Sequence, residues 1–221
     1  MERSKIAIII PAYNEAKTIG KVIKKVKYFG FPIVVNDCST DGTAKILKKL
    51  KVKVLNNKKN LGYEKTLKRG LNFAKKKNFK FLITIDGDDQ HNSSDIKKII
   101  NKLNKNDVVY TIRNNLNRFS EKFFAFISLY LCEIEDPLSG LKGYKINIFK
   151  KYNFKNWDNL FGSDLLLYAK LKGFKVEGIF TRIKKRKGVS RIGDSSYLNL
   201  KILLSIVYLF KNYLIYKKNK K

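Results

Sequence analysis

The sequence predicts an α/β fold in which a mostly parallel sheet carries helices on both faces. Short apolar runs that suit buried strands alternate with stretches of about a dozen residues whose apolar side chains recur at helical spacing. In addition, the polar loops 11–15, 36–43 and 86–91 each directly follow an apolar run. Because the carboxyl ends of parallel strands meet at one edge of a sheet, we expect these three loops to gather there.

The first half of the chain alternates strand and helix. A continuous apolar run at 5–10 is typical of a central parallel strand, and Pro11 should end it. Further strands are expected at 32–35, 52–55, 81–85 and 107–112. Helices are expected at 16–28, 43–50, 63–77 and 93–103. Thr40 or Asp41 is expected to cap the second of these helices.

The second half is less regular. Helices are expected at 118–134, 146–151, 163–172 and 197–216, and strands at 141–144 and 174–183, the last of them broken at Gly178. A basic loop at 184–195 precedes the last helix. Because no linker or repeat divides the chain, we expect one domain at 1–196 and, after it, an amphipathic and basic C-terminal helix at 197–221.

A cluster of carboxylates follows the apolar run at 81–85. Asp86 and Asp88 are two residues apart in a turn, so both side chains can point to one cation. Hard oxygen ligands suit Mg²⁺ or Mn²⁺, which would also hold phosphate oxygens of a substrate. A solvated acidic loop would give the same pattern, but these carboxylates stand out in a chain whose formal net charge is +30.

The excess of positive charge, 48 Lys and Arg against 18 Asp and Glu, implies an anionic partner. Nucleic acid, a phosphorylated substrate and an acidic membrane surface all qualify. With His91 as the single histidine and Cys38 and Cys132 as the two cysteines, a zinc site built from His and Cys is excluded. Because the cysteines form no CxxC pair and no signal peptide is visible, we expect a cytoplasmic protein.

Membrane contact is predicted for the C-terminal helix. No segment reaches 18 uninterrupted apolar residues, and the candidates at 123–132 and 202–210 are expected to be too short to span a bilayer. The helix at 197–216 instead has one apolar side and a basic end at 217–221, which suits peripheral contact with an anionic membrane. That apolar side consists of Leu198, Ile202, Ile206 and Leu209. Packing against the domain is the alternative use of this side.

Four stretches, in this order, resemble the family 2 glycosyltransferases with a GT-A fold. They are IIIPAYNE at 8–15, NDCSTDGT at 36–43, NLGY at 60–63 and DGDDQH at 86–91. A fifth stretch, DPLSGLK at 136–142, resembles the acceptor-side signature of dolichyl-phosphate mannose synthases and related polyprenyl-phosphate sugar transferases. The basic RKGVSR at 186–191 resembles the closing loop of those enzymes.

The resemblance implies a role for each matching residue. Nucleotide contacts would come from Pro11, Tyr13, Glu15, Asp37, Asp86 and Gly87, with Asp37 accepting a hydrogen bond from the base. The metal ligands would be Asp86, Asp88 and Gln90, and the glutamine points to the lipid-phosphate subgroup. Catalytic roles would fall to Asp86, Asp88 and Asp136. Phosphate or acceptor contacts would come from Arg113, Arg118, Ser139, Lys142, Arg186, Ser190 and Arg191.

Three positions depart from the family pattern. Asn36 stands where Asp is frequent, Cys38 where Gly is usual, and Lys142 where Arg is frequent. The lysine keeps the positive charge but loses the bidentate fork of a guanidinium group.

The activity that the resemblance implies is an inverting, metal-dependent transfer of a hexose from a nucleotide sugar, of the GDP-mannose or UDP-glucose class, to dolichyl or undecaprenyl phosphate. Such an enzyme would act peripherally on the cytosolic face of a membrane, and a membrane-anchoring subunit is left open as a further partner. A family 2 transferase with a soluble or cell-surface glycan acceptor is the alternative. A non-enzymatic basic nucleic-acid-binding protein is a distant alternative, because apolar strands and acidic loops do not suit nucleic acid.

Overall fold

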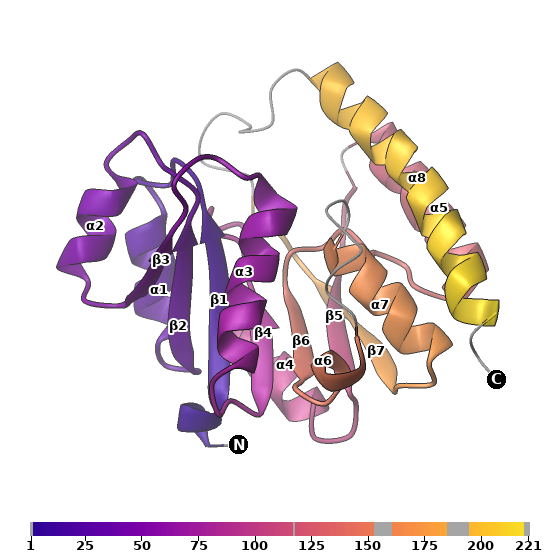
Figure 1. Cartoon of the computed structure of the whole chain (residues 1–221), viewed down its shortest axis with the longest axis horizontal. Coiled ribbons are helices and arrows are strands. Elements are labelled where there is room, and N and C mark those ends of the chain that lie inside the picture. The colour runs from indigo at the N-terminus through magenta and orange to yellow at the C-terminus, as the bar shows by residue number, and fades with distance from the viewer. Residues whose placement is uncertain (1, 117, 153–160, 185–194, 219–221) are drawn as a thin grey trace.

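The structure is a computed structural model that describes residues 2–116, 118–152, 161–184 and 195–218. Within these ranges, a seven-stranded sheet with the order β3-β2-β1-β4-β6-β5-β7 forms the centre, and helices cover both of its faces (Figure 1). The predicted α/β class is confirmed. The strands are β1 Ile6–Ala12, β2 Phe31–Asn36, β3 Lys53–Asn56, β4 Phe81–Thr84, β5 Val108–Arg113, β6 Lys142–Lys145 and β7 Val176–Thr181. The helices are α1 Ile19–Val26, α2 Thr43–Lys49, α3 Tyr63–Lys75, α4 Ser94–Lys102, α5 Phe119–Cys132, α6 Ile148–Lys151, α7 Phe161–Leu171 and α8 Ser195–Lys218.

The direction of the strands decides where the loops meet. All pairings are parallel except those of β6, which is antiparallel to both β4 and β5. The carboxyl ends of β1, β2, β4 and β5 therefore share one edge of the sheet with the amino end of β6. The three polar loops predicted to gather do lie at this edge, and the segment that leads into β6 joins them there.

Two apolar clusters fill the space between the sheet and its helices. Side chains of successive strand residues point to opposite faces, so each strand serves both clusters. On β1, Ile8 and Ile10 pack toward α1, α2 and α4, whereas Ala7 and Ile9 pack toward α3 and the helices of the second half. Burial on both faces explains why the central strands are continuous apolar runs rather than alternating ones.

Pro11 lies inside β1 and does not end it, contrary to prediction. The strand continues to Ala12, and Pro11 pairs with Val35 of β2. On the other side of β1, the ladder with β4 ends where the backbone nitrogen of Ile85 donates to the carbonyl oxygen of Ile9. The backbone nitrogen of Pro11 points to the same side of β1 as the backbone groups of Ile9, beyond the end of the ladder with β4. The missing N–H group of proline therefore costs no ladder hydrogen bond.

The loops at this edge turn sharply at residues with left-handed backbone. Asn14, Cys38 and Asp89 have φ values of 54°, 58° and 61°, one in each of the three loops. Few residues other than glycine adopt this conformation without strain. The value at Cys38 gives a physical reason why glycine is usual at that position of the family pattern.

Gly178 does not break the last strand, and here too the structure differs from the sequence prediction. β7 runs without interruption, and Gly178 pairs with Tyr110 of β5. A β-carbon at position 178 would lie 2.7 Å from Cδ1 of Ile112 and 3.0 Å from the hydroxyl oxygen of Tyr110. The glycine therefore serves close side-chain packing over the strand, and it does not mark a turn.

The C-terminal helix differs most from expectation. α8 packs against α5 and α7 through Ile202, Leu209 and Tyr216, so the apolar side predicted to meet a membrane is the one that the domain covers. The opposite side is also apolar and exposed, so α8 is not the simple amphipathic helix that was predicted. By length and composition, Leu198–Lys218 could cross a membrane, and no other helix in the described part of the chain could. This corrects the expectation that the segment is too short.

Candidate functional site

The turn after β4 brings its side chains toward the edge where the loops meet. Oδ1 of Asp88 accepts a hydrogen bond of 3.1 Å from the backbone nitrogen of Gln90. The amide Nε2 of Gln90 donates to the carbonyl oxygen of Lys184 at 3.2 Å, and the Lys184 nitrogen donates to the Gln90 carbonyl at 2.9 Å. Asp89 points elsewhere, because Lys25 and Lys21 of α1 bind its carboxylate at 2.7 and 3.2 Å.

The loop 135–141 contacts this turn directly. Oγ1 of Thr84 donates to the carbonyl oxygen of Gly140 at 2.9 Å. A β-carbon on Gly140 would lie only 2.1 Å from Oδ2 of Asp86, so the backbone of this loop is packed against the Asp86 carboxylate. The predicted metal turn at 86–91 and the predicted acceptor loop at 136–142 thus lie side by side, although they are far apart in sequence.

Asp136 is held by a fork of hydrogen bonds from Arg113, at the end of β5. Nε of Arg113 donates to Oδ2 of Asp136 at 2.7 Å, and Nη2 donates to Oδ1 at 3.0 Å. Nη1 of Arg113 lies 3.5 Å from Glu121, which also pairs with Arg118 at 3.7 Å. Burial alone would lower the pKa of Arg113, but Asp136 and Glu121 outweigh it and raise that pKa. The two hydrogen bonds from Arg113 fix Asp136 in one orientation.

Ser139 and Lys142 support the loop from below. The Ser139 hydroxyl is fully buried and lies 2.5 Å from the hydroxyl of Thr111. Nζ of Lys142 is buried and donates to the carbonyl oxygen of Pro137 at 2.9 Å. Burial lowers the pKa of Lys142 to about 8, although Glu64, Asp136 and Asp86 act in the opposite direction. Both residues lie beside the predicted acceptor site, and their side chains are occupied in holding the loop.

The predicted nucleotide contacts lie around the ends of β1 and β2. Gly87 lies close to Pro11 and Glu15, since a β-carbon at Gly87 would lie 3.4 Å from atoms of both. Oε2 of Glu15 accepts a hydrogen bond from Oγ1 of Thr18 at 2.8 Å. Tyr13 is half-buried in the same loop. These residues are brought together as the sequence predicts.

Asp37 is more occupied than its predicted role suggests. Its Oδ1 accepts from Nδ2 of Asn57 at 2.6 Å and from the backbone nitrogen of Leu61 at 2.9 Å. Its Oδ2 accepts from the backbone nitrogen of Gly62 at 2.9 Å. The buried carboxylate thus holds the turn before α3, and its contact with a base stays a prediction.

The residues predicted to bind a metal fit a hard divalent cation. No group of three or more His, Cys, Asp or Glu side chains in the described ranges is arranged to hold a metal, so the set depends on two carboxylates and one amide. Because Nε2 of Gln90 donates to the carbonyl oxygen of Lys184, the side-chain oxygen of Gln90 points away from that carbonyl group. Oxygen ligands of this kind suit Mg²⁺ or Mn²⁺ when substrate phosphate and water complete the shell.

Two residues of this region have no role predicted from the sequence. The hydroxyl of Tyr63 is hydrogen-bonded to Asp86. Burial of this hydroxyl and the nearby Asp86 carboxylate raise the pKa of Tyr63 well above its usual value, although part of the residue is exposed. His91 is buried with Nε2 3.9 Å from Oδ2 of Asp86. Burial lowers the pKa of His91 to about 4, so the imidazole is neutral at pH 7. Both residues belong to stretches that carried the family resemblance, which was the available signal.

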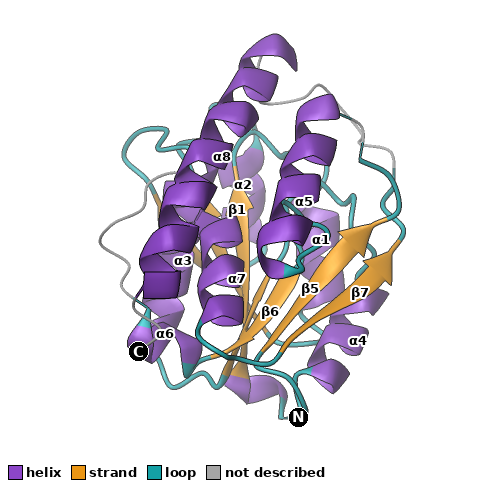
Figure 2. Cartoon of the chain, turned by 90° about the vertical axis from the view of Figure 1, so that its right-hand side faces the viewer, coloured by secondary structure: helices purple, strands orange, loops and turns teal. Residues whose placement is uncertain are grey.

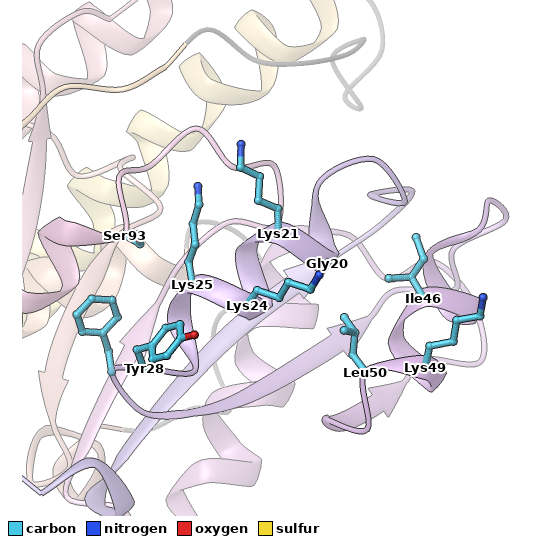
Figure 3. A pocket seen from close by; sticks show the side chains of 10 residues that line it. Gly20, Lys21, Lys24, Lys25, Tyr28, Ile46, Lys49, Leu50 and Ser93 are labelled. Carbon is cyan, nitrogen blue, oxygen red and sulfur yellow. The ribbon is translucent and has the colours of Figure 1, made fainter.

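A separate hollow lies beside α1. It has a volume of about 840 Å³ and lies between α1 and α2 (Figure 3). Lys21, Lys24, Lys25 and Lys49 line it, and none of the predicted site residues does. Because ammonium groups cannot ligate a metal ion, we place the candidate site at the carboxylate turn and not in this hollow.

Three predicted residues, Arg186, Ser190 and Arg191, lie outside the described residues. The chain reaches that segment from Lys184, which is hydrogen-bonded to Gln90.

Residues 7–177 match the sequence model of the family described as Glycosyl transferase family 2. Over 133 residues, which are 54% of this chain and 58% of the relative, the chain is 40% identical to an uncharacterised protein of Methanocaldococcus jannaschii. Over 135 residues, 52% of this chain and 54% of the relative, it is 29% identical to the UDP-N-acetylglucosamine–dolichyl-phosphate N-acetylglucosaminyltransferase of Methanococcus voltae. The matches thus span little more than half the length of these two relatives.

Among solved structures, the chain is similar to glucosyl-3-phosphoglycerate synthase from Mycobacterium tuberculosis in complex with Mn²⁺, uridine diphosphate and phosphoglyceric acid. The TM-score is 0.77 at 16% identity, over 96% of this chain and 78% of the other. A likeness at this identity shows a common fold, and the C-terminal helix is part of the matched length.

Proposed function

The chain belongs to glycosyl transferase family 2, and from that premise we propose that it transfers a hexosyl group from a nucleotide sugar to a polyprenyl phosphate, with inversion at the sugar. One observation carries the proposal: the backbone of the loop 135–141 lies against the Asp86 carboxylate. That contact puts the residues expected to hold a donor diphosphate beside those expected to face an acceptor.

The donor would be held at the ends of β1 and β4. Asp86, Asp88 and Gln90 would hold Mg²⁺ or Mn²⁺, which, when bound, neutralises the charge of the leaving diphosphate. Among the donors expected from the sequence, a uridine diphosphate sugar has support, since the Methanococcus voltae relative is named for such a donor and the Mycobacterium tuberculosis structure contains uridine diphosphate.

The acceptor side needs orientation more than proton transfer. A lipid phosphate is already an anion near pH 7, so it can attack without a strong general base. Asp136, which Arg113 binds through both oxygens, is suited to orient a sugar or acceptor hydroxyl. Burial lowers the pKa of His91 to about 4, so its imidazole is only a weak base. A phosphate acceptor, confined to the cytosolic face of a membrane, is consistent with this arrangement.

The proposal is tested by transfer from radiolabelled sugar nucleotides to dolichyl or undecaprenyl phosphate in detergent, with phosphoglyceric acid as the soluble comparison. We expect transfer to the lipid phosphate, dependent on Mn²⁺ or Mg²⁺ and lost in excess chelator. Asp88→Asn should lower turnover at least about 100-fold with the fold intact, because one ligand charge is removed from the metal.

The control is Asp107→Asn, at the opposite edge of the sheet, where the carboxylate pairs with Lys145. This variant should keep the turnover of the parent. Equal turnover of Asp88→Asn and the parent would remove the metal role. Transfer to the soluble acceptor alone would contradict the proposed lipid acceptor and support a family 2 transferase with a soluble acceptor.

A further inference from the structure

The exposed apolar side chains of this protein are concentrated on two neighbouring helices. Of the 18 large apolar residues that are exposed in the described ranges, five lie on α5 and eight lie on α8. The two helices pack against each other and lie on the same side of the molecule, which faces the viewer in Figure 2. We call their outer surface the apolar plate; it includes Phe119, Phe126 and Tyr130 of α5 and Leu204, Val207 and Leu214 of α8.

The plate is too apolar for a surface that faces only water. A helix that is apolar all round is normally covered on all sides, by a protein core or by lipid. α8 has one covered stripe, formed by residues such as Ile202 and Leu209, and its remaining apolar side chains are uncovered. Contiguous exposed apolar surface of this kind marks a site of association.

Hydrogen bonds join the two helices of the plate at one end and fix α8 to the rest of the domain at the other. Near the start of the two helices, Oγ of Ser120 donates to Oδ1 of Asn199 at 2.6 Å. Near the end of α8, the buried carboxylate of Asp164 accepts from Nδ2 of Asn212 at 2.6 Å and from the Tyr216 hydroxyl at 2.8 Å. The Tyr152 hydroxyl donates to the same carboxylate.

These contacts argue against α8 as a membrane-spanning helix. If α8 left the domain to cross a bilayer, it would leave Asp164 without two of its hydrogen-bond donors and carry Asn212 into the hydrocarbon. α8 is therefore held against the domain, and the plate is part of the domain surface.

The charges around the plate select its occupant. On α8 there is no acidic residue, and Lys201, Lys211 and Lys217 are exposed. On α5, Lys122 is exposed, whereas Glu121 is buried and paired with arginine. The complementary surface is apolar with negative charge, as an anionic lipid surface is. A second copy of the chain would bring lysines against lysines, in a protein of net charge +30, and is disfavoured.

We infer that the apolar plate docks on the surface of an anionic lipid bilayer, with its aromatic and aliphatic side chains in the headgroup region and its lysines at the phosphates. The inference rests on the proposed function for its biological purpose. It adds α5 as a contact surface and assigns the outer side of α8, rather than the side predicted from the sequence.

Docking in this orientation would bring the candidate site to the membrane surface. Arg118 directly precedes α5 and shares Glu121 with Arg113, which holds Asp136. The near end of the plate is therefore two ion pairs from the acceptor loop. A lipid phosphate in the docked bilayer would lie at the height of Arg118.

The test is flotation of the full chain with vesicles, without donor or acceptor. Vesicles of phosphatidylcholine with phosphatidylglycerol are compared with vesicles of phosphatidylcholine alone. We expect the parent to float with the anionic vesicles and less so at high salt, since salt screens the charges and leaves the apolar contacts.

Two double variants probe the two helices separately. Phe126→Glu with Tyr130→Glu changes side chains of α5 that are 64% and 84% exposed, and Leu204→Glu with Val207→Glu changes side chains of α8 that are 56% and 67% exposed. Each pair should weaken vesicle binding at least about tenfold, because two apolar contacts are lost and two negative charges are added. The control is Tyr28→Glu, two residues after the end of α1, where the side chain is 63% exposed. Because this residue is not part of the plate, the variant should bind as the parent does.

Each outcome decides the inference. Vesicle binding by the parent that is lost in both double variants, with melting temperatures unchanged, supports it. The inference is overturned if the parent does not float, if the α5 variant floats like the parent, or if the parent is a dimer that the double variants dissociate. If the parent floats as expected but glycosylates no lipid phosphate, the proposed function fails and the docking surface stands.

Discussion

Gly140→Ala should displace the Asp86 carboxylate without unfolding the protein. A β-carbon at position 140 would lie 2.1 Å from Oδ2 of Asp86, about 1.3 Å short of the 3.4 Å at which ordinary contact begins. The backbone φ of Gly140 is outside the left-handed region, so the effect of the methyl group is steric. Because the clashing atoms belong to a side chain, Asp86 can rotate away while the backbone stays in place.

The size of the functional effect follows from that distance. A displacement of about 1 Å in a catalytic group typically costs about 100-fold in rate. We therefore expect kcat/KM to fall about 100-fold, equivalent to about 2.7 kcal/mol of transition-state stabilisation. The Mn²⁺-dependent part of nucleoside diphosphate affinity, measured by calorimetry, should fall in the same variant.

The matched control is Gly20→Ala on α1. A β-carbon there would meet Ile46 at 3.6 Å, which is ordinary contact, and alanine favours a helix by up to about 1 kcal/mol over glycine. Gly20→Ala should keep the activity and melt at the same or a higher temperature. If Gly140→Ala keeps the activity and metal dependence of the parent, the position of Asp86 against this loop does not matter for turnover, and the site as described is wrong.

Two further predictions concern buried polar groups. Asp164→Ala leaves the donors on Tyr152, Asn212 and Tyr216 without their acceptor, so the free energy of unfolding in urea should fall by about 3 kcal/mol or more. Hydrogen exchange of the α8 amides should accelerate in this variant, and Asp164→Asn should lose less stability. Equal losses of stability in the two variants would contradict this prediction. Lys142 has a pKa of about 8 in the folded protein, below its value in the unfolded chain, so between about pH 8 and pH 10 the unfolded state holds the extra proton and stability should rise with pH. The rise can reach about 3 kcal/mol in the parent, and Lys142→Met should lack it. Parallel curves of unfolding free energy against pH for the parent and Lys142→Met, from about pH 7.5 to about 9.5, would refute this prediction.

Local patterns predicted the sheet and the meeting of the three polar loops at one edge well, because buried parallel strands are nearly uniform apolar runs and their polar loops must meet at one edge. The errors at Pro11 and Gly178 have one cause. Whether a strand tolerates proline or glycine depends on which neighbour faces that residue, and neighbours such as β4 or Tyr110 are not visible in the local sequence.

The helix α8 shows a second limit. Periodicity selected the side formed by Leu198, Ile202, Ile206 and Leu209, which is the side that the domain covers, but it could not show whether this side meets the domain or a membrane. The choice is made by Asp164 and Tyr152, which are 48 and 60 positions before Asn212. Long-range hydrogen bonds of this kind carry no local signal.

The two arginines proposed for phosphate contact illustrate how the structure separates residues that the sequence treats alike. Moving Arg113 onto a phosphate would leave Asp136, which is 2% exposed, without its partner, and breaking a buried pair costs about 3–5 kcal/mol. Among the described residues, Arg118 forms an ion pair with Glu121 at 3.7 Å, and its side chain is 29% exposed, so breaking this pair costs less than about 1 kcal/mol. Arg118 is therefore the arginine that can turn to a phosphate, and Arg113 is the one that keeps Asp136 in position while it does.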